Sequence, residues 1–267
     1  MFCVVNPLFS VYYCYDSIGS LGPYLIQSGV LSTEQLSSLI SIYSIVPLVA
    51  VLVTGVLVDL TGLRAVFIYS LVLVVSGNTI LALAFKANTF WMMIVGRVIM
   101  GSAESAFVVS LALLGLLFKE NITVATSIGI TWGQIGAVLV FIIQPAVYSS
   151  FGLFKAMMVP IGSALFSLST SLLLLTIDIL FLGNTTAKTT QTEKLHLSDL
   201  KNFSLEFWMI MVGNTLPTGA FIVSQTLGSL YLVEWGLMEE QEAGYVVGVA
   251  NMIQLGVPLV GFFIQKR

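Results

Sequence analysis

Charged residues are scarce in this 267-residue chain: Asp, Glu, Lys and Arg make up 9% of it, against about 25% in ordinary soluble domains. Apolar residues make up 57%, and the mean hydropathy is +1.01. This contrast excludes a soluble globular protein, and the high hydrophobicity excludes a disordered chain. The net charge of -3 leaves no basic face for binding nucleic acid. The composition therefore predicts an integral membrane protein that lies in a lipid bilayer.

Cysteine and histidine are scarce too, with Cys3, Cys14 and His196 as the complete set. Two cysteines in an apolar stretch give neither a disulfide framework nor a zinc-ligand spacing. His196 has no Cys, His or carboxylate at a ligand spacing. The sequence also lacks a P-loop, an H-E-x-x-H motif and a nucleophile and base arranged around its histidine. It therefore predicts a protein that is not an enzyme and holds no cofactor or metal.

Long apolar runs dominate what is present, and a helix needs about 20 residues to cross the hydrocarbon of a bilayer. The runs are continuous and lack the alternation of barrel strands, so they predict an all-α membrane protein. We expect the first run to be broken by Asp16 and by the cluster of Gly19, Gly22 and Pro23. The eight runs cover residues 2–26, 36–58, 65–85, 90–118, 122–148, 155–182, 205–233 and 243–264.

One connection is long and polar, residues 183–204 after the sixth run. It predicts a six-helix lobe over residues 1–182, a cytoplasmic linker over 183–204, and the first two helices of a second lobe over 205–267. Because Lys and Arg accumulate in cytoplasmic loops, the basic residues after runs 2, 4, 6 and 8 predict a cytoplasmic N-terminus. These residues are Arg64, Lys119, Lys188, Lys194, Lys201, Lys266 and Arg267.

A charged, glycine-containing turn joins the second and third runs: Gly55, Asp59, Gly62 and Arg64 form the pattern G-x-x-x-D-x-x-G-x-R. The glycines permit a close helix approach and a sharp turn, and Asp59 and Arg64 can form ion pairs that differ between conformations. We interpret these four residues as a conformational latch, with an ordinary polar turn as the alternative. The chain ends in the opening of the same pattern, residues 261–267, which predicts a six-span repeat.

Three ionisable residues lie inside the apolar runs, where a charge costs ~2.5–3.5 kcal/mol or more: Asp16, Arg97 and Glu104. Glu104 is a candidate cavity carboxylate that binds a substrate amino group or carries a proton; the alternative is a glutamate that only ties two helices together. Arg97, seven residues earlier on the same predicted helical face, is either a structural charge that snorkels to the surface or a contact for a substrate carboxylate. Asp16 either caps a broken helix or lines the cavity.

The turn between runs 2 and 3 resembles the signature loop of the major facilitator superfamily, with Leu60 where that loop usually has a basic residue. Residues 13–16, 96–105 and 200–208 further resemble the lysosomal dipeptide transporters of that superfamily, the domain-containing protein 1 type. The resemblance implies the major facilitator fold, with a complete N-terminal six-helix lobe and the first two helices of the C-terminal lobe. Such proteins have twelve spans, so we expect this chain to be a fragment or a truncated product.

The resemblance also implies a function: alternating-access transport of dipeptides or related amino-acid-like metabolites across the lysosomal or another endomembrane, with an accessory membrane glycoprotein as partner. Glu104 matches the family glutamate that takes the peptide amino group. The family arginine suited to the peptide carboxylate corresponds here to Gln134, which donates hydrogen bonds without supplying a charge. We expect Gln134 and Trp132 to line the cavity. The alternative is a truncated membrane protein that transports nothing and acts as a binding or assembly partner.

The expected topology makes a prediction about glycosylation. Sequons begin at Asn121, Asn184 and Asn202, all in loops that this topology places in the cytosol. We expect none of them to be glycosylated, so endoglycosidase treatment of the expressed protein leaves its electrophoretic mobility unchanged. A mobility shift that is lost on replacing one of these asparagines by glutamine would overturn the topology.

Overall fold

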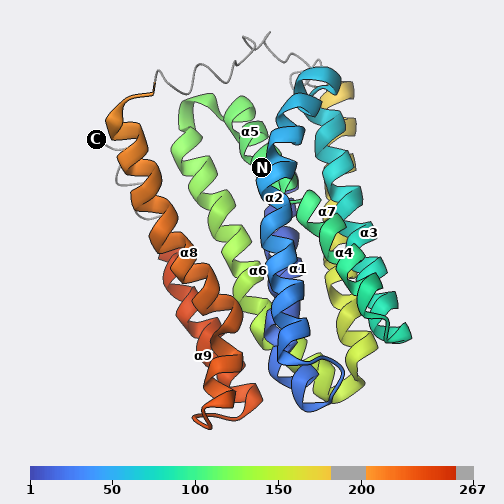
Figure 1. Cartoon of the computed structure of the whole chain (residues 1–267). Coiled ribbons are helices and arrows are strands. Elements are labelled where there is room, and N and C mark those ends of the chain that lie inside the picture. The colour runs from blue at the N-terminus through green and yellow to red at the C-terminus, as the bar shows by residue number, and fades with distance from the viewer. Residues whose placement is uncertain (182–202, 257–267) are drawn as a thin grey trace.

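The computed structural model describes residues 1–181 and 203–256, and these residues form helices joined by short turns (Figure 1). The predicted all-α fold is confirmed. Most of the expected linker, the sequons at Asn184 and Asn202, and the repeated pattern at 261–267 lie outside the described residues. The elements are α1 (Phe2–Gln27), α2 (Thr33–Thr61), α3 (Leu63–Ala87), α4 (Phe90–Ser102), α5 (Ser105–Leu117), η1 (Lys119–Asn121), α6 (Ile122–Phe151), α7 (Leu153–Phe181), α8 (Leu205–Glu234), α9 (Glu240–Asn251) and η4 (Met252–Gly256).

Local sequence signals set several helix ends. The backbone N–H of Gln35 donates to the Ser32 hydroxyl at the start of α2, and the Ser32 N–H donates to the Gln35 side chain, which is a capping box. The turn from α2 to α3 contains Gly62 at φ +87°, a conformation that glycine adopts without steric cost. This turn lets two long apolar helices follow each other almost directly.

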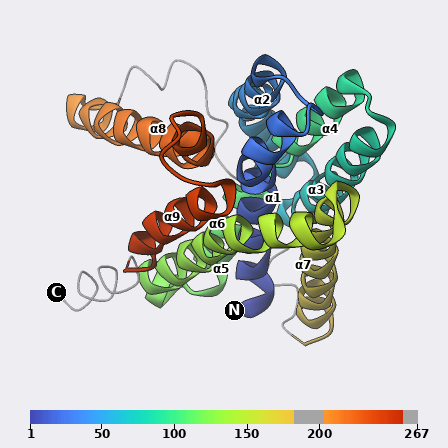
Figure 2. The same cartoon turned by 90° about the horizontal axis from the view of Figure 1, so that it is seen from below.

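Helix α1 lies in the middle of the bundle and packs against α5, α6, α7 and α8 (Figure 2). The expected break in α1 is wrong, because the helix continues through Asp16 and includes Pro23. Neighbouring helices enclose the backbone around these positions, and such packing overrides the weak helix propensity of glycine and proline. Five stretches of the described residues are long and apolar enough to cross a membrane, and α1 is not among them. Helix α1 also carries several polar side chains that are buried against other helices: Asn6, Ser10, Asp16, Ser17 and Ser20.

The fourth apolar run does contain a break, where one continuous helix over residues 90–118 was expected. Helix α4 ends at Ser102 and α5 begins at Ser105, so Ala103 and Glu104 lie between two helical segments of one crossing. The Ala103 N–H bonds to the carbonyls of both Ile99 and Met100, which tightens the last turn of α4. Both residues keep right-handed helical dihedrals, with φ -82° and ψ -6° at Ala103 and φ -55° and ψ -24° at Glu104. The break is therefore a tightened turn within one crossing, and Glu104 lies in it.

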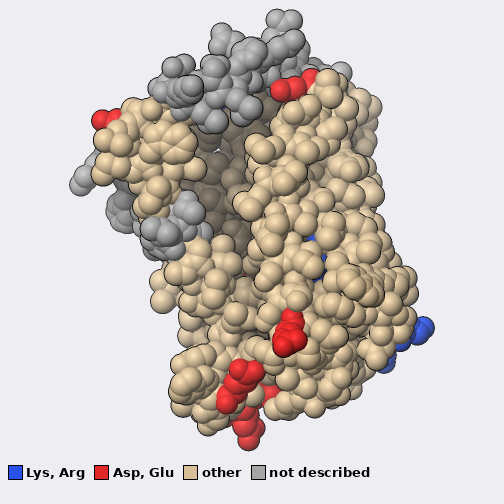
Figure 3. Space-filling view, viewed as in Figure 1, with Lys and Arg blue, Asp and Glu red and all other residues tan. Residues whose placement is uncertain are grey.

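Helices α8 and α9 contact the rest of the bundle at one end. The hydroxyl of Ser229 donates to the carbonyl of Gly19 at 3.3 Å, and Gly244 of α9 packs against the backbone of α6. The first turns of α8, residues 205–213, are exposed. Figure 3 shows a hollow between α8 and the remaining helices on the side away from the α8–α9 turn. The described helices thus meet near that turn and separate toward the opposite end.

The contact between α1 and α6 depends on glycines that remove side chains from the interface. A Cβ atom on Gly136 would lie 2.5 Å from the carbonyl oxygen of Phe9, and one on Gly133 would lie 2.8 Å from the ring of Tyr12. Small residues at such positions let helix backbones approach closely in a membrane. Helix α6 can therefore lie directly on the central helix.

We expect Gly136→Ala to lower the free energy of unfolding by about 1–3 kcal/mol, because the new methyl group meets backbone that cannot rotate away. Gly162→Ala in α7 is the matched control, since its Cβ would have no heavy atom within 4 Å. Thermal unfolding of both variants in detergent measures the difference. Equal stability of the two variants would contradict the close packing of α1 on α6.

Candidate functional site

A cavity of about 450 Å³ lies between α1, α2, α5 and α8, beside the break that follows α4. Its volume falls in the range of pockets that hold small organic molecules, ~300–1,000 Å³. Most of its lining is aromatic or aliphatic. Among the described residues, Asp16 and Glu104 are its charged lining residues. The structure therefore brings together two of the three intramembrane charges that the sequence analysis singled out.

Glu104 is held at the break by a residue of another helix. The hydroxyl of Tyr43, in α2, donates to Oε2 of Glu104 at 2.6 Å. Tyr43 is itself 4% exposed, so this hydrogen bond lies in the interior of the bundle. A short hydrogen bond from a phenol to a carboxylate is of the stronger, charge-assisted kind. The bond fixes the orientation of the Glu104 carboxylate toward the cavity wall formed by α2.

Asp16 occupies the opposite wall, in the middle of α1. Its Oδ2 accepts a hydrogen bond of 2.7 Å from Nε2 of Gln225 in α8, and its Oδ1 has no hydrogen-bond partner among the described residues. The carboxylate is fully buried in the protein. Asp16 therefore lines the cavity and does not cap a broken helix. Its second oxygen is an unused acceptor that is buried in the wall of the cavity.

Arg97 lies next to this site without lining it. Its guanidinium carbon is 5.1 Å from the ring centroid of Tyr43, and Nη1 donates to the carbonyl of Tyr15 at 3.5 Å. The side chain is 1% exposed, so it does not reach the membrane surface as a snorkelling arginine would. Within the part of the chain that the structure describes, Arg97 forms no salt bridge. The cation is thus buried on the protein side of the Tyr43 ring.

Aromatic rings complete the cavity wall. Tyr15 and Tyr43 have ring centroids 4.7 Å apart, and Tyr12 and Phe107 have theirs 5.9 Å apart. The faces of such rings attract cations through their quadrupoles. Carboxylates and ring faces together form a chemical environment suited to an ammonium group. Residues 1–181 and 203–256 contain no cluster of three or more His, Cys, Asp or Glu side chains that would hold a metal ion.

Two expected cavity residues, Trp132 and Gln134 in α6, do not line this cavity. The indole N–H of Trp132 donates to Oδ1 of Asn6 at 3.4 Å, and its ring packs 5.8 Å from those of Phe2 and Phe9. Gln134 is buried, and its Oε1 has no hydrogen-bond partner in the described part of the chain. No residue of helix α6 is in the cavity lining, so both side chains lie outside the site.

The sequence analysis missed several residues of the site, above all Tyr43 and Gln225. Each is a polar side chain within a long apolar run, which is the signal that could have drawn attention to it. Their roles depend on partners 61 and 209 residues away along the chain, Glu104 and Asp16 respectively. Spacing within one helix gives no information about such contacts.

The residues interpreted as a latch lie at the α2–α3 turn, away from the cavity. The guanidinium of Arg64 forms a salt bridge with the carboxylate of Asp178 near the end of α7, and Asp59 is exposed. Gly62 provides the sharp turn. A Cβ on Gly55 would have no heavy atom within 4 Å, so Gly55 mediates no close helix approach in this conformation. The ion pair connects α3 to α7 across the end of the bundle.

We expect Arg64→Gln and Asp178→Asn each to lower the free energy of unfolding by about 1–3 kcal/mol. The effect is below the ~3–5 kcal/mol of a fully buried pair because the Arg64 side chain is 18% exposed. The double variant loses both charges together and should be destabilised by less than the sum of the two single changes. Thermal unfolding of the four proteins in detergent measures this coupling, and strictly additive effects would rule it out.

Comparison with known proteins agrees with this architecture. The family model described as Major Facilitator Superfamily matches residues 5–267. The chain is similar to the lysosomal dipeptide transporter MFSD1 of Danio rerio, with 27% identity over 97% of this chain and 59% of that protein. It is also similar to the MFSD1 protein of Gallus gallus, with 28% identity over 71% of this chain and 46% of that protein. The chain thus spans about half the length of these curated relatives, and it belongs to the major facilitator superfamily.

Proposed function

We propose that this protein carries a small organic solute across a membrane by alternating access, as a secondary-active or facilitative transporter. The observation that supports this most is the cavity beside the break in the fourth crossing, where carboxylates from the central helix α1 and from that crossing line one space. Broken helices that supply ligand groups near the middle of the bilayer are a recurring feature of secondary transporters. No covalent chemistry is needed for such a cycle, so we propose no enzymatic activity.

The packing of α8 and α9 supports an assignment of the conformation. These helices contact α1 and α6 near the α8–α9 turn and separate from the bundle at the other end. If the linker over residues 183–204 and the N-terminus are cytoplasmic, as the basic residues indicate, the separated end faces the cytoplasm. The structure then corresponds to an inward-facing state, with residues 1–182 and 205–267 belonging to two lobes that move relative to each other.

The substrate that we propose is a small molecule with an amino group, and dipeptides or related amino-acid-like metabolites are the first candidates. Both relatives are named lysosomal dipeptide transporters, which also supports the lysosomal or another endomembrane as the location. Glu104 and Asp16 would accept hydrogen bonds from the substrate ammonium. The family resemblance adds an accessory membrane glycoprotein as a proposed partner.

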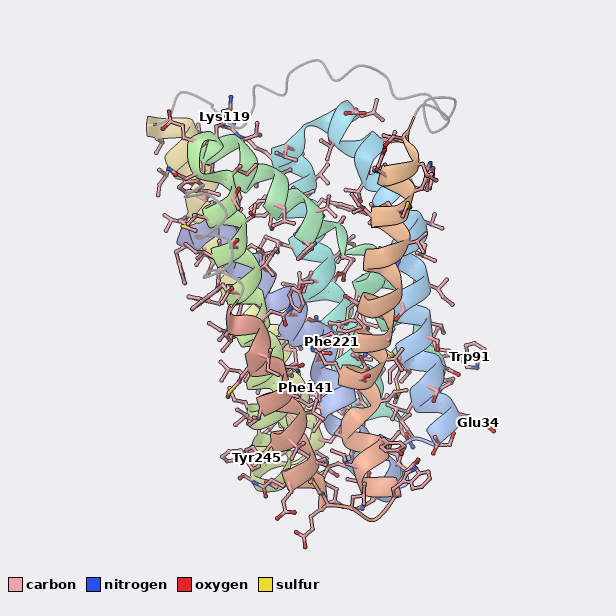
Figure 4. The ribbon with its side chains drawn as sticks, turned by 90° about the vertical axis from the view of Figure 1, so that its left-hand side faces the viewer. Glu34, Trp91, Lys119, Phe141, Phe221 and Tyr245 are labelled. Carbon is pink, nitrogen blue, oxygen red and sulfur yellow. The ribbon has the colours of Figure 1, made fainter. Side chains whose placement is uncertain are left out.

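The experiment that tests this function is uptake of a mixed dipeptide panel into proteoliposomes that contain the full-length protein. We expect Glu104→Gln to reduce uptake about tenfold or more, because it removes a charge-assisted hydrogen bond to the ammonium. Glu34→Gln is the matched control, since Glu34 is exposed and projects outward from the first turn of α2 (Figure 4). Membrane insertion of both variants should be normal. Unchanged uptake by the Glu104 variant would refute its role, and no uptake by the wild type would favour a non-transporting partner protein.

A further inference from the structure

One face of the fourth crossing contacts Tyr43 of α2 at its ring, its backbone and its hydroxyl. The guanidinium carbon of Arg97 lies 5.1 Å from the ring centroid, and the hydroxyl donates to Oε2 of Glu104 at 2.6 Å. A Cβ atom on Gly101 would lie 3.1 Å from the carbonyl oxygen of Tyr43. Residues 97, 101 and 104 follow the i, i+4, i+7 spacing of a single helical face. The crossing therefore holds every part of this tyrosine.

The ring of Tyr43 connects Arg97 to Glu104. These two residues, both in the described part of the chain, form no salt bridge with each other, and their spacing along the helix corresponds to about 10 Å of rise. A guanidinium is attracted to the face of an aromatic ring and draws electron density out of it. A phenol that has lost electron density is a stronger hydrogen-bond donor. Arg97 therefore strengthens the hydrogen bond that Tyr43 gives to Glu104.

A second tyrosine, in α1, supports the same arrangement. The ring centroids of Tyr15 and Tyr43 are 4.7 Å apart, with the ring planes inclined at 55°. Nη1 of Arg97 donates to the carbonyl of Tyr15 at 3.5 Å, so the guanidinium contacts both tyrosines. Arg97 and Tyr43 are buried, and close packing leaves a buried ring few alternative positions. The direction of the Tyr43 hydroxyl is thus set before a ligand arrives.

Glu104 differs from these residues because it is partly exposed and lines the cavity. Tyr43 holds its carboxylate through one oxygen, Oε2. A group whose orientation is already fixed loses less freedom when a ligand binds, which raises the affinity. Arg97 is outside the cavity lining and acts on Glu104 only through the tyrosine.

From these contacts we infer that Arg97 is a positioning residue: through the ring of Tyr43 it sets the orientation of the Glu104 carboxylate, and thereby the affinity of the cavity for an ammonium group, without touching the ligand. The inference rests on the proposed function, because it concerns the same carboxylate and the same cavity. It gives a reason to keep a cation inside the bundle, where its burial is costly. This role differs from the two that the sequence alone suggests, which are snorkelling to the surface and contact with a substrate carboxylate.

The carboxyl resonance of Glu104 tests the positioning in the absence of any ligand. The full-length protein is labelled with carboxyl-carbon-13 glutamate, and Glu104→Gln identifies the resonance by its loss. Tyr43→Phe removes the hydroxyl and keeps the ring, and Arg97→Met removes the cation and keeps a side chain of similar length. We expect each change to move the Glu104 resonance. In the Tyr43→Phe protein, we expect the further change Arg97→Met to move it no more.

Two results would overturn the inference. If Arg97→Met leaves the resonance where it is in the wild type, the cation does not act on Glu104. If Arg97→Met moves the resonance as far in the Tyr43→Phe protein as in the wild type, Arg97 acts through its own electric field and not through Tyr43. Replacing a buried charge by an apolar side chain is expected to preserve the fold, which thermal unfolding checks. Arg97→Lys, which keeps a cation without the planar group, gives a second measurement and should move the resonance by less.

Uptake of alanylphenylalanine into proteoliposomes gives the functional readout. We expect Arg97→Met and Tyr43→Phe each to raise KM about fivefold or more, with a maximal rate within about twofold of the wild type, and the double variant to show no more than the larger single effect. Tyr148→Phe is the matched control, since the Tyr148 ring packs 4.9 Å from that of Tyr24 and does not line the cavity.

The two experiments separate this inference from the proposed function. An unchanged KM in both the Arg97 and the Tyr43 variants overturns the inference and leaves a dipeptide carrier in place. If the wild type takes up no dipeptide, the proposed substrate fails instead, and the resonance of Glu104 still decides whether Arg97 positions it through Tyr43.

Discussion

A backbone that crosses a bilayer has to satisfy its hydrogen bonds within the protein, because the hydrocarbon offers none. This requirement makes the described residues helical, and it makes the interruption at Ala103 and Glu104 informative. The interruption lies within the fourth crossing, beside a cavity and under the hydroxyl of Tyr43. The charge of Glu104 and the tightened turn thus share one enclosed position. The charge would be costly if it faced lipid, so the packing of α1, α2 and α8 around Glu104 keeps it inside the protein.

The same reasoning accounts for the composition of the central helix. Helix α1 is not among the stretches long and apolar enough to cross a membrane, yet most of its side chains are buried, including that of Asp16. A helix enclosed by other helices can carry polar groups that a lipid-facing helix cannot, provided that they have partners. Asn6 bonds to Ser167 of α7, and Asp16 bonds to Gln225 of α8. The polar groups of α1 thereby connect it to helices far apart in the sequence.

Much of the fold could be predicted from the sequence, because the length and hydropathy of the apolar runs follow directly from bilayer thickness. The position of the helix break could not be predicted. The glycines and Pro23 of α1 are a stronger local signal for a break than Ala103 and Glu104, but packing by other helices keeps α1 continuous, and the break lies after α4. Asp16 and Glu104 were found as candidates because charge within hydrocarbon is costly, whatever the fold. Tyr43 and Gln225 were missed because their importance arises from contacts between separate helices. Trp132 and Gln134 were expected in the cavity by resemblance, and the structure places them outside it.

The glycine contacts between α1 and α6 have a mechanical consequence. Backbone packed on backbone has no long side chains that could bend to absorb a displacement, so α1 and α6 form a stiff pair. Helix α8 meets the same α1 just as closely at one point, where a Cβ atom on Gly19 would lie 2.9 Å from the carbonyl oxygen of Thr226. Gln225 on Asp16 and Ser229 on Gly19 link the two helices around that point, whereas the first turns of α8 are exposed. A relative movement of the two sides would therefore leave the α1 wall of the cavity in shape and turn α8 about its contact with Gly19.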